Sequence, residues 1–235
     1  MMRRLVRILG TLLIAAGLGT LAWAFVVWRW EDPFTGVYTR LEQRELASSY
    51  ERRFDEFVPR ASPASLADRR GRLRADAKLF RTSSRRGEAI GRLRIKRLGL
   101  NMIVVNGTDH RTLRRGPGRY LGSFMPGEGE LVYVAGHRTT YLAPFSHIDR
   151  LRSGDRVIFE LPYAAFEYRV TRSVVVEATA LEVLRSRGRE TLALQACHPR
   201  FFATHRLLVY AAPVRATPRG AGSQPIPAAA LATSD

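Results

Sequence analysis

The most conspicuous pattern in the chain is an uninterrupted apolar stretch close to its N-terminus. The segment from Ile8 to Trp28 contains 21 residues and no charge. A helix of that length, at about 1.5 Å per residue, spans about 30 Å, which is the thickness of the hydrocarbon core of a bilayer. Helices buried inside globular proteins rarely run so far without polar residues. The pattern therefore predicts a basic stub and a membrane-spanning helix within residues 1–30.

Basic residues are more numerous before this stretch than after it. Arg3, Arg4 and Arg7 precede it, whereas Glu31 and Asp32 follow it, beyond Arg29. Basic residues next to a membrane-spanning helix stay on its cytoplasmic side. We therefore expect a single membrane pass, with the N-terminus in the cytoplasm and the rest of the chain outside the cell.

A cleaved signal peptide is the rival interpretation of the same segment. The run Ala22-Trp23-Ala24 resembles a small-x-small cleavage site. However, the apolar pattern continues to Trp28, and a tryptophan is a poor neighbour for cleavage. Trp23, Trp28 and Trp30 also cluster at the far end, where indole rings favour the headgroup region. The uncleaved anchor is the favoured interpretation, and the signal peptide stays open.

Residues 31–87 follow as a charged, partly helical spacer. Apolar side chains recur there at near-helical spacing in two stretches, which predicts two helices. The first stretch holds Leu41, Leu46, Tyr50, Phe54 and Phe57 and ends at Pro59, and the second holds Leu66, Leu73, Ala77 and Phe80. Ser65 and Asp68 resemble a capping box at the start of the second helix. Because both apolar stripes are narrow, we expect these helices to pack on the following domain or on another copy of the chain.

The pattern changes to short runs of β-branched residues from Glu88 onward. These runs predict strands near residues 91–96, 102–106, 131–135, 156–161, 164–177, 191–196 and 206–212. Short helical turns are expected at 109–114 and 180–184. Seven or eight short strands with few helices indicate an all-β domain, a closed barrel or a sandwich, over residues 88–213. Residues 214–235 are rich in proline, alanine and glycine and are predicted to form a disordered tail.

The chain is strongly basic, with a net charge of +17 that comes almost entirely from arginine. The stretch from Asp68 to Arg86 alone holds eight basic and two acidic residues. Such a stretch can bind nucleic acid, but export argues against a nucleic-acid partner. Contact with anionic headgroups or wall polymers fits an exported chain better, and a solvated face of the spacer is the simplest interpretation.

Cys197 is the only cysteine, so it can form neither an internal disulfide nor a multi-cysteine metal cage. A thiol attacks as its thiolate, of which only about 3% is present at pH 7 for an ordinary cysteine. It therefore needs a nearby proton acceptor or positive charge. His137 ends one predicted strand and Arg206 opens the strand after Cys197. The loop between His198 and His205 can return the chain so that Cys197 and Arg206 lie side by side. A guanidinium in that place can stabilise an oxyanion but cannot act as a base.

Several motifs in this order resemble the sortase family of membrane-anchored cysteine transpeptidases. The resemblance covers about Gly91 to Pro213. It rests on a strand ending in Gly136-His137-Arg138, a strand ending in Cys197, and an arginine nine residues later. Cys197-His198-Pro199, the segment 137–145 and the segment 151–155 are similar to the class E branch of that family.

The resemblance implies an eight-stranded β-barrel with short helices and an acyl-transfer mechanism without a cofactor. Cys197 is then the nucleophile that attacks the threonine carbonyl of a sorting signal such as Leu-Ala-x-Thr-Gly or Leu-Pro-x-Thr-Gly and forms a thioester. His137 gives a proton to the leaving amine and later takes one from the incoming amine, and Arg206 stabilises the oxyanion. The implied partners are exported proteins that carry the signal, and an amine of peptidoglycan or of a pilin subunit.

The chain departs from the family pattern at Ala196, where the family usually has a threonine. We expect this change to affect a residue beside the substrate and to shift the sorting-signal preference. Two alternatives to a transpeptidase stay open: a thiol hydrolase on the same barrel, and a non-catalytic module that binds the wall or membrane. The catalytic and the non-catalytic alternatives differ in whether Cys197 is needed.

Metal sites are not expected. A zinc site made of Cys197, His137 and either His198 or His205 lacks the usual ligand spacings. The loop 178–190 holds only Glu182 and Glu190, too few for the calcium site that some sortases carry. We expect His198 and His205 to be structural, and His110 and His147 to lie at the surface.

Overall fold

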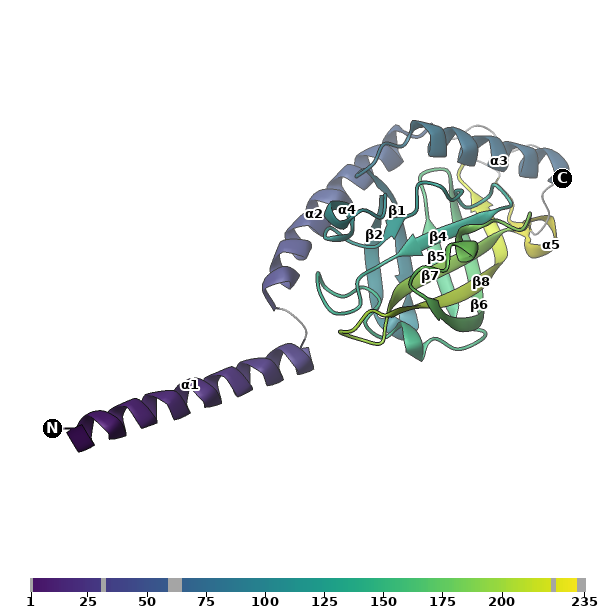
Figure 1. Cartoon of the computed structure of the whole chain (residues 1–235). Helices are drawn as coiled ribbons and strands as arrows, with labels where there is room; N and C mark the ends of the chain where they lie inside the picture. The colour runs from purple at the N-terminus through teal and green to yellow at the C-terminus, as the bar shows by residue number, and fades with distance from the viewer. Residues whose placement is uncertain (1, 31–32, 59–64, 221–222, 232–235) are drawn as a thin grey trace.

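The structure is a computed structural model that describes residues 2–30, 33–58, 65–220 and 223–231, with residues 27–30 and 33–34 described in their backbone alone. The predicted headgroup positions of Trp28 and Trp30 therefore lie outside the described side chains. The chain forms a long N-terminal helix, two helices that follow it, and a β-barrel (Figure 1).

The N-terminal helix α1 (Met2–Trp30) stands clear of the barrel in Figure 1. Its segment Met2–Val26 has a hydropathy of 1.9, and none of it is buried. An apolar helix that is exposed over most of its length is suited to an apolar surrounding. By length and composition α1 is able to cross a membrane. A signal sequence has the same properties, so the uncleaved anchor stays a prediction.

Two helices form in the predicted spacer, and both pack on the barrel. They are α2 (Pro33–Glu56) and α3 (Leu66–Ser83). Ser65 is the N-cap of α3: its hydroxyl accepts from the Asp68 backbone N–H at 3.1 Å and donates to the Asp68 carboxylate at 2.6 Å, which is half of the predicted capping box. The narrow stripes meet the barrel in two clusters. Leu46 and Tyr50 pack with Ala89, Ile103 and Val105, whereas Leu73, Ala77 and Phe80 join the main core.

The described strands form one sheet that closes on itself. The strands are β1 (Ala89–Ile95), β2 (Leu100–Asn106), β3 (Gly118–Arg119), β4 (Leu131–Ala135), β5 (Arg156–Glu160), β6 (Ala164–Glu177), β7 (Thr191–His198), β8 (His205–Pro218) and β9 (Ile226–Pro227). Their order is β6-β5-β1-β2-β3-β4-β7-β8-β9, and an additional pairing of β6 with β8 closes the ring. Eight strands therefore make a closed barrel, with β9 added beside β8. The predicted eight-stranded barrel is confirmed.

Short helical elements connect the strands. They are η1 (Lys96–Leu98), α4 (His110–Leu113), η2 (Ile148–Arg150) and η3 (Leu181–Leu184), and α5 (Ala228–Leu231) follows β9. The helix predicted at 109–114 corresponds to α4, which begins after Asp109 because its carboxylate accepts from the Thr112 N–H. The strand β3 was not predicted, because two residues are too few to show an alternating pattern.

Alternation along three neighbouring strands gives the barrel two apolar faces. Val132 and Val134 of β4 belong to the main core, while Leu131, Tyr133 and Ala135 belong to a second cluster on the opposite face. The same alternation is found on β7 and β8. Ala193 and Leu208 belong to the second cluster, whereas the main core holds Leu192, Leu194, Ala196, Leu207, Val209 and Ala211. We call the second cluster the outer face. Val183 and Leu184 of η3 pack against it.

The C-terminal residues differ from the predicted disordered tail. Strand β8 continues to Pro218, β9 pairs with it, and Ile226 and Leu231 are buried in the main core. Composition predicted disorder because this stretch is rich in proline, alanine and glycine. Two apolar side chains nevertheless find partners in the barrel core, and burying them favours the ordered form.

Candidate active site

The pairing of β4 with β7 brings the predicted histidine and cysteine to the same edge of the sheet. The two strands are parallel, with Ala135 opposite Gln195. His137 and Cys197 each lie two residues further along their strands, so both stand at the same end. The Gly136 N–H donates to the Gln195 carbonyl at 3.0 Å and extends the pairing beyond the ends of the ladder.

The pairing of β7 with β8 places Cys197 opposite Arg206. Directly opposed residues of antiparallel strands have Cβ atoms about 4.5–5.5 Å apart. The side-by-side arrangement expected of these two residues is therefore present. The Arg206 guanidinium donates to the carbonyls of Ala203 at 2.8 Å and His205 at 2.9 Å. These bonds hold the guanidinium against the loop between the two strands.

Both side chains lie on the outer face of the barrel. Residues that are an even number of positions apart in a strand share a face. Cys197 therefore lies on the same face as Ala193, and Arg206 lies on the same face as Leu208. Cys197 and Arg206 are half-buried. A partly open thiol at the end of a strand can be reached by a substrate that lies along this face.

The placement of Ala196 corrects an expectation. Its side chain is 0% exposed and belongs to the main core, on the face opposite to Cys197. Adjacent residues of a strand point to opposite sides of the sheet, so the nucleophile and the residue before it cannot both face the substrate. Ala196 therefore points into the core and not toward the side of Cys197. The alternation of side chains along the strand could have predicted this from the sequence.

His137 lies half-buried at the end of β4. Burial lowers the pKa of His137, and the nearby His110 lowers it further. The Nε2 atom of His137 is buried and has no hydrogen-bond partner within the described part of the chain. A lowered pKa favours the neutral imidazole, whose unpartnered ring nitrogen can accept a proton from a group that reaches it. His110 was expected only at the surface. It is exposed, but it also acts on His137.

The loop that follows His137 is held by the helix α2. The Tyr141 ring centroid lies 5.0 Å from that of His137. The Tyr141 N–H donates to Thr35 Oγ1 at 2.9 Å. The Arg114 guanidinium lies 5.3 Å from the Tyr141 ring and 5.2 Å from the Tyr38 ring. Tyr141 is thus fixed between the candidate histidine and α2.

The same loop has an unusual backbone. Tyr141, Leu142 and Ala143 have φ values of 55°, 58° and 36°. Left-handed backbone costs an L-residue about 1–2 kcal/mol, so three in a row need support from their surroundings. The hydrogen bond from Tyr141 to Thr35 and those from Ala143 to Thr140 and from Phe145 to His137 provide it.

Arg138 joins the two strand ends at the site, a role that the sequence did not reveal. Its guanidinium donates to the Cys197 carbonyl at 3.1 Å and to the Asp149 carboxylate at 2.9 Å, and lies 2.9 Å from His198 Nδ1. The Arg138 side chain is 4% exposed. The only signal in the sequence was its position beside His137.

The other histidines near Cys197 have partners of their own. His198 contacts Arg138, and His205 contacts Glu177 at 3.1 Å and Thr204 at 2.9 Å. Their structural role stays a prediction. Within the described residues, no group of three or more His, Cys, Asp or Glu side chains is arranged to hold a metal ion.

Comparison with known proteins gives one family. Residues 93–214 match the Sortase domain family, which is more than half of the chain. Sortase D from Bacillus subtilis (strain 168) is 29% identical over 128 residues, which cover 53% of this chain. That match spans 63% of the length of the curated relative.

Solved structures with the same fold are also sortases. Sortase E from Streptomyces avermitilis is 32% identical, with a TM-score of 0.52, over 60% of this chain and 97% of that one. A Clostridium perfringens sortase D5 transpeptidase is 19% identical, with a TM-score of 0.60, over 74% of this chain and 98% of that one. The similarity to class E is thus confirmed, and class D sortases are similar as well.

Proposed function

The chain belongs to the sortase family, and on that premise we propose that it is a membrane-anchored cysteine transpeptidase with Cys197, His137 and Arg206 as its catalytic residues. The observation that carries the proposal is the register of three strands. It sets Cys197 opposite Arg206 and brings His137 to the same end of the sheet. A thiol, an imidazole and a guanidinium can serve covalent acyl transfer as nucleophile, proton carrier and oxyanion donor.

The first half of the reaction forms a thioester. The Cys197 proton passes to the neutral His137, and the sulfur attacks the carbonyl carbon of the substrate threonine. The C–S bond forms and the carbonyl oxygen gains the negative charge. As the C–N bond breaks, the His137 imidazolium gives its proton to the leaving amine. The low pKa of His137 helps this last step, because a weakly basic imidazole releases its proton readily.

The second half reverses the roles. The incoming amine attacks the acyl carbon of the thioester and gives its proton to His137. The C–N bond forms, the C–S bond to Cys197 breaks, and the Cys197 sulfur recovers a proton from the imidazolium. In both halves Arg206 faces the position of the oxyanion. Its bonds to Ala203 and His205 hold the guanidinium in place before the substrate arrives, which lowers the cost of reorganisation.

The proposed substrates are exported proteins with a sorting signal of the Leu-Ala-x-Thr-Gly or Leu-Pro-x-Thr-Gly kind, cleaved after threonine. The proposed acceptor is an amine of peptidoglycan or of a pilin subunit. We also propose that α1 stays as a single-pass anchor with its N-terminus in the cytoplasm. The basic residues before the apolar run support that orientation.

The test uses the full chain in detergent micelles with fluorogenic peptides of both signals, with and without an amine such as triglycine. Mass spectrometry separates transfer to the amine from hydrolysis. We expect cleavage between threonine and glycine, and transfer when the amine is present. Cys197→Ala and His137→Ala should lower kcat/KM by at least about 10³-fold.

Arg206→Lys and Arg206→Ala separate charge from geometry, because lysine keeps the charge and loses the fork of donors. Circular dichroism checks that each variant is folded. Turnover of Cys197→Ala at the parent rate is incompatible with the proposal. Hydrolysis without transfer at any amine concentration would identify a thiol hydrolase instead.

A further inference from the structure

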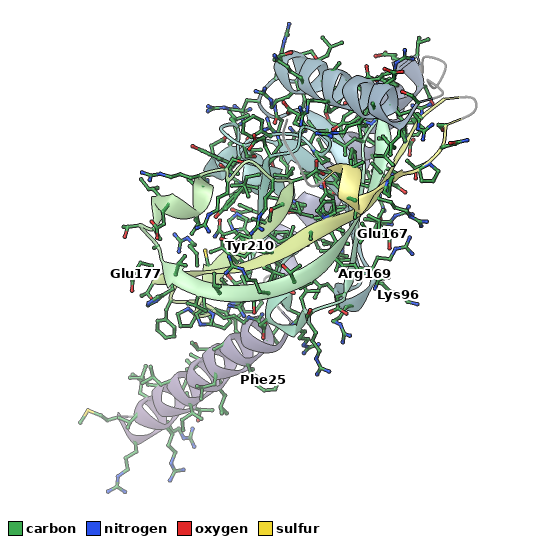
Figure 2. All side chains as sticks on the ribbon, turned by 90° about the vertical axis from the view of Figure 1, so that its right-hand side faces the viewer. Phe25, Lys96, Glu167, Arg169, Glu177 and Tyr210 are labelled. Carbon is green, nitrogen blue, oxygen red and sulfur yellow. The ribbon has the colours of Figure 1, made fainter. Side chains whose placement is uncertain are left out.

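A cavity of about 610 Å³ lies on the outer face of the barrel, away from Cys197. Its walls come from η3 and the loop after it, from β6 and β8, and from α5. The residues that line it include four arginines, Leu131 of β4, Thr191 of β7, Tyr210 of β8 and Ala228 of α5. Figure 2 looks toward this part of the barrel, with Tyr210 labelled on β8 and Glu177 at the end of β6.

Four arginines surround the cavity: Arg172, Arg185, Arg187 and Arg189. All four are exposed, and none forms an ion pair with a carboxylate in the part of the chain that the structure describes. Such a group differs from the arginines around Glu167, which share one carboxylate. Like charges held together repel, so an anion that enters the group is bound favourably.

The two acidic residues of the lining do not neutralise these arginines. Glu190 is 3% exposed and its carboxylate is used inside the barrel, where it accepts from the Tyr168 hydroxyl at 2.7 Å and from the Gly127 N–H at 2.8 Å. Glu182 is exposed and is a single carboxylate beside four arginines. The cavity therefore keeps an excess of positive charge.

The floor of the cavity is apolar and partly aromatic. Leu131 and Val183 belong to the outer face, and Tyr210 packs against the same cluster. The Arg172 guanidinium lies 4.4 Å from the centre of the Tyr210 ring. Arginines above an apolar floor suit a peptide that carries carboxylates next to apolar side chains, because a guanidinium binds a carboxylate through two parallel donors.

The strand β7 connects this cavity to the nucleophile. Thr191 lines the cavity and Cys197 stands six residues later on the same strand. At about 3.3 Å per residue the two are about 20 Å apart. An extended substrate needs about six residues to reach from one to the other.

We propose that this cavity binds an acidic segment of the protein substrate, about six residues from the scissile bond. The inference rests on the proposed function, to which it adds a requirement outside the sorting signal. One wall, Ala228 of α5, lies outside the segment that matches the family, 93–214. The site therefore depends on the C-terminal segment of this chain, whose Ile226 and Leu231 are anchored in the core.

The experiment measures binding without catalysis. The full chain with Cys197→Ala, in detergent micelles, is titrated with fluorescent peptides that share one sorting signal. One peptide has three glutamates centred six residues before the scissile bond, a second has them six residues after it, a third has them twelve residues before it, and a fourth has three glutamines in the position of the first. We expect one of the six-residue glutamate peptides to bind about tenfold tighter than the glutamine peptide at low salt, and this preference to fall at 0.5 M salt.

Charge-matched variants locate the site. Arg187→Gln with Arg189→Gln should abolish the preference for the glutamate peptide. The control, Arg40→Gln with Arg52→Gln, removes the same charge from exposed positions on α2 and should keep it. The proposal is wrong if all four peptides bind equally, if the third peptide is preferred, or if the preference survives in the Arg187/Arg189 variant.

Kinetics of the parent chain separate this proposal from the proposed function. If the glutamine peptide is cleaved and the glutamates give no advantage in binding or in kcat/KM, the acidic-segment site alone is refuted. If no peptide is cleaved but the glutamate peptide binds through Arg187 and Arg189, the proposed function fails and the binding site stands.

Discussion

Replacing Arg138 by methionine tests how the two strand ends of the candidate site are held together. The Arg138 guanidinium bridges the Cys197 carbonyl and the Asp149 carboxylate, and the side chain is almost fully buried. Methionine keeps most of the apolar length and removes the charge and the donors. We expect the variant to fold with a lower free energy of unfolding.

The size of the loss follows from the contacts. A hydrogen bond from a charged donor contributes about 1.5–3 kcal/mol. The pair with Asp149, which is 53% exposed, adds less than about 1 kcal/mol. The buried Nε of Arg138 has no partner in the described part of the chain. Removing this unpaired donor raises the free energy of unfolding by about 1 kcal/mol and offsets part of the loss. The net loss is about 2 kcal/mol, or about 4–8 °C in Tm for a chain of this size.

Urea and thermal unfolding of the full chain in detergent micelles measure this loss. Arg150→Met is the matched control, because Arg150 is exposed and lies beside Asp149. Asp149→Asn should cost less than about 1 kcal/mol, since it removes only the exposed partner. An Arg138→Met variant within about 0.5 kcal/mol of the parent, or an equal loss in Arg150→Met, contradicts the reasoning.

Three further predictions concern single side chains. Tyr141→Ala should raise the pKa of His137 toward its ordinary value, because water replaces the ring, whereas Tyr141→Phe should not; NMR titration of the imidazole decides. Burial raises the pKa of Glu190 to about 7 from 4.5, against the hydrogen bond from Tyr168 that lowers it. The folded chain then holds more protons than the unfolded chain between these values, so stability should fall as pH rises from 4.5 through 7, by up to about 3 kcal/mol. Glu190→Gln should flatten that fall in urea titrations at pH 5 and 8, and an unchanged slope would contradict it. Ala196→Thr should lower stability by about 1–3 kcal/mol, because it adds a methyl and a hydroxyl to a packed core, and should leave the ratio of kcat/KM values across a panel of signals unchanged; a changed ratio would restore the original expectation.

Local patterns in the sequence were enough for most of the elements, and the family resemblance added the three candidate catalytic residues. The apolar run of α1, the bounds of β4 and β6, and the capping box of Ser65 and Asp68 each depend on residues close together in the chain. Cys197 and Arg206 flank one short loop, so their meeting could be anticipated. His137 was placed by resemblance, because the chain alone does not state which strand lies beside β7.

Tertiary structure decided what the sequence left open, because these features depend on strand register and on contacts between distant residues. The register of β7 directs the Ala196 side chain into the core, on the face opposite to Cys197. A contact across 59 residues made Arg138 the bridge to Cys197. Packing in the barrel core ordered Ile226 in a stretch whose composition predicts disorder. The four arginines of the cavity gathered in the same way, since the strands bring Arg172 and the loop 185–189 together although they are separate in the chain.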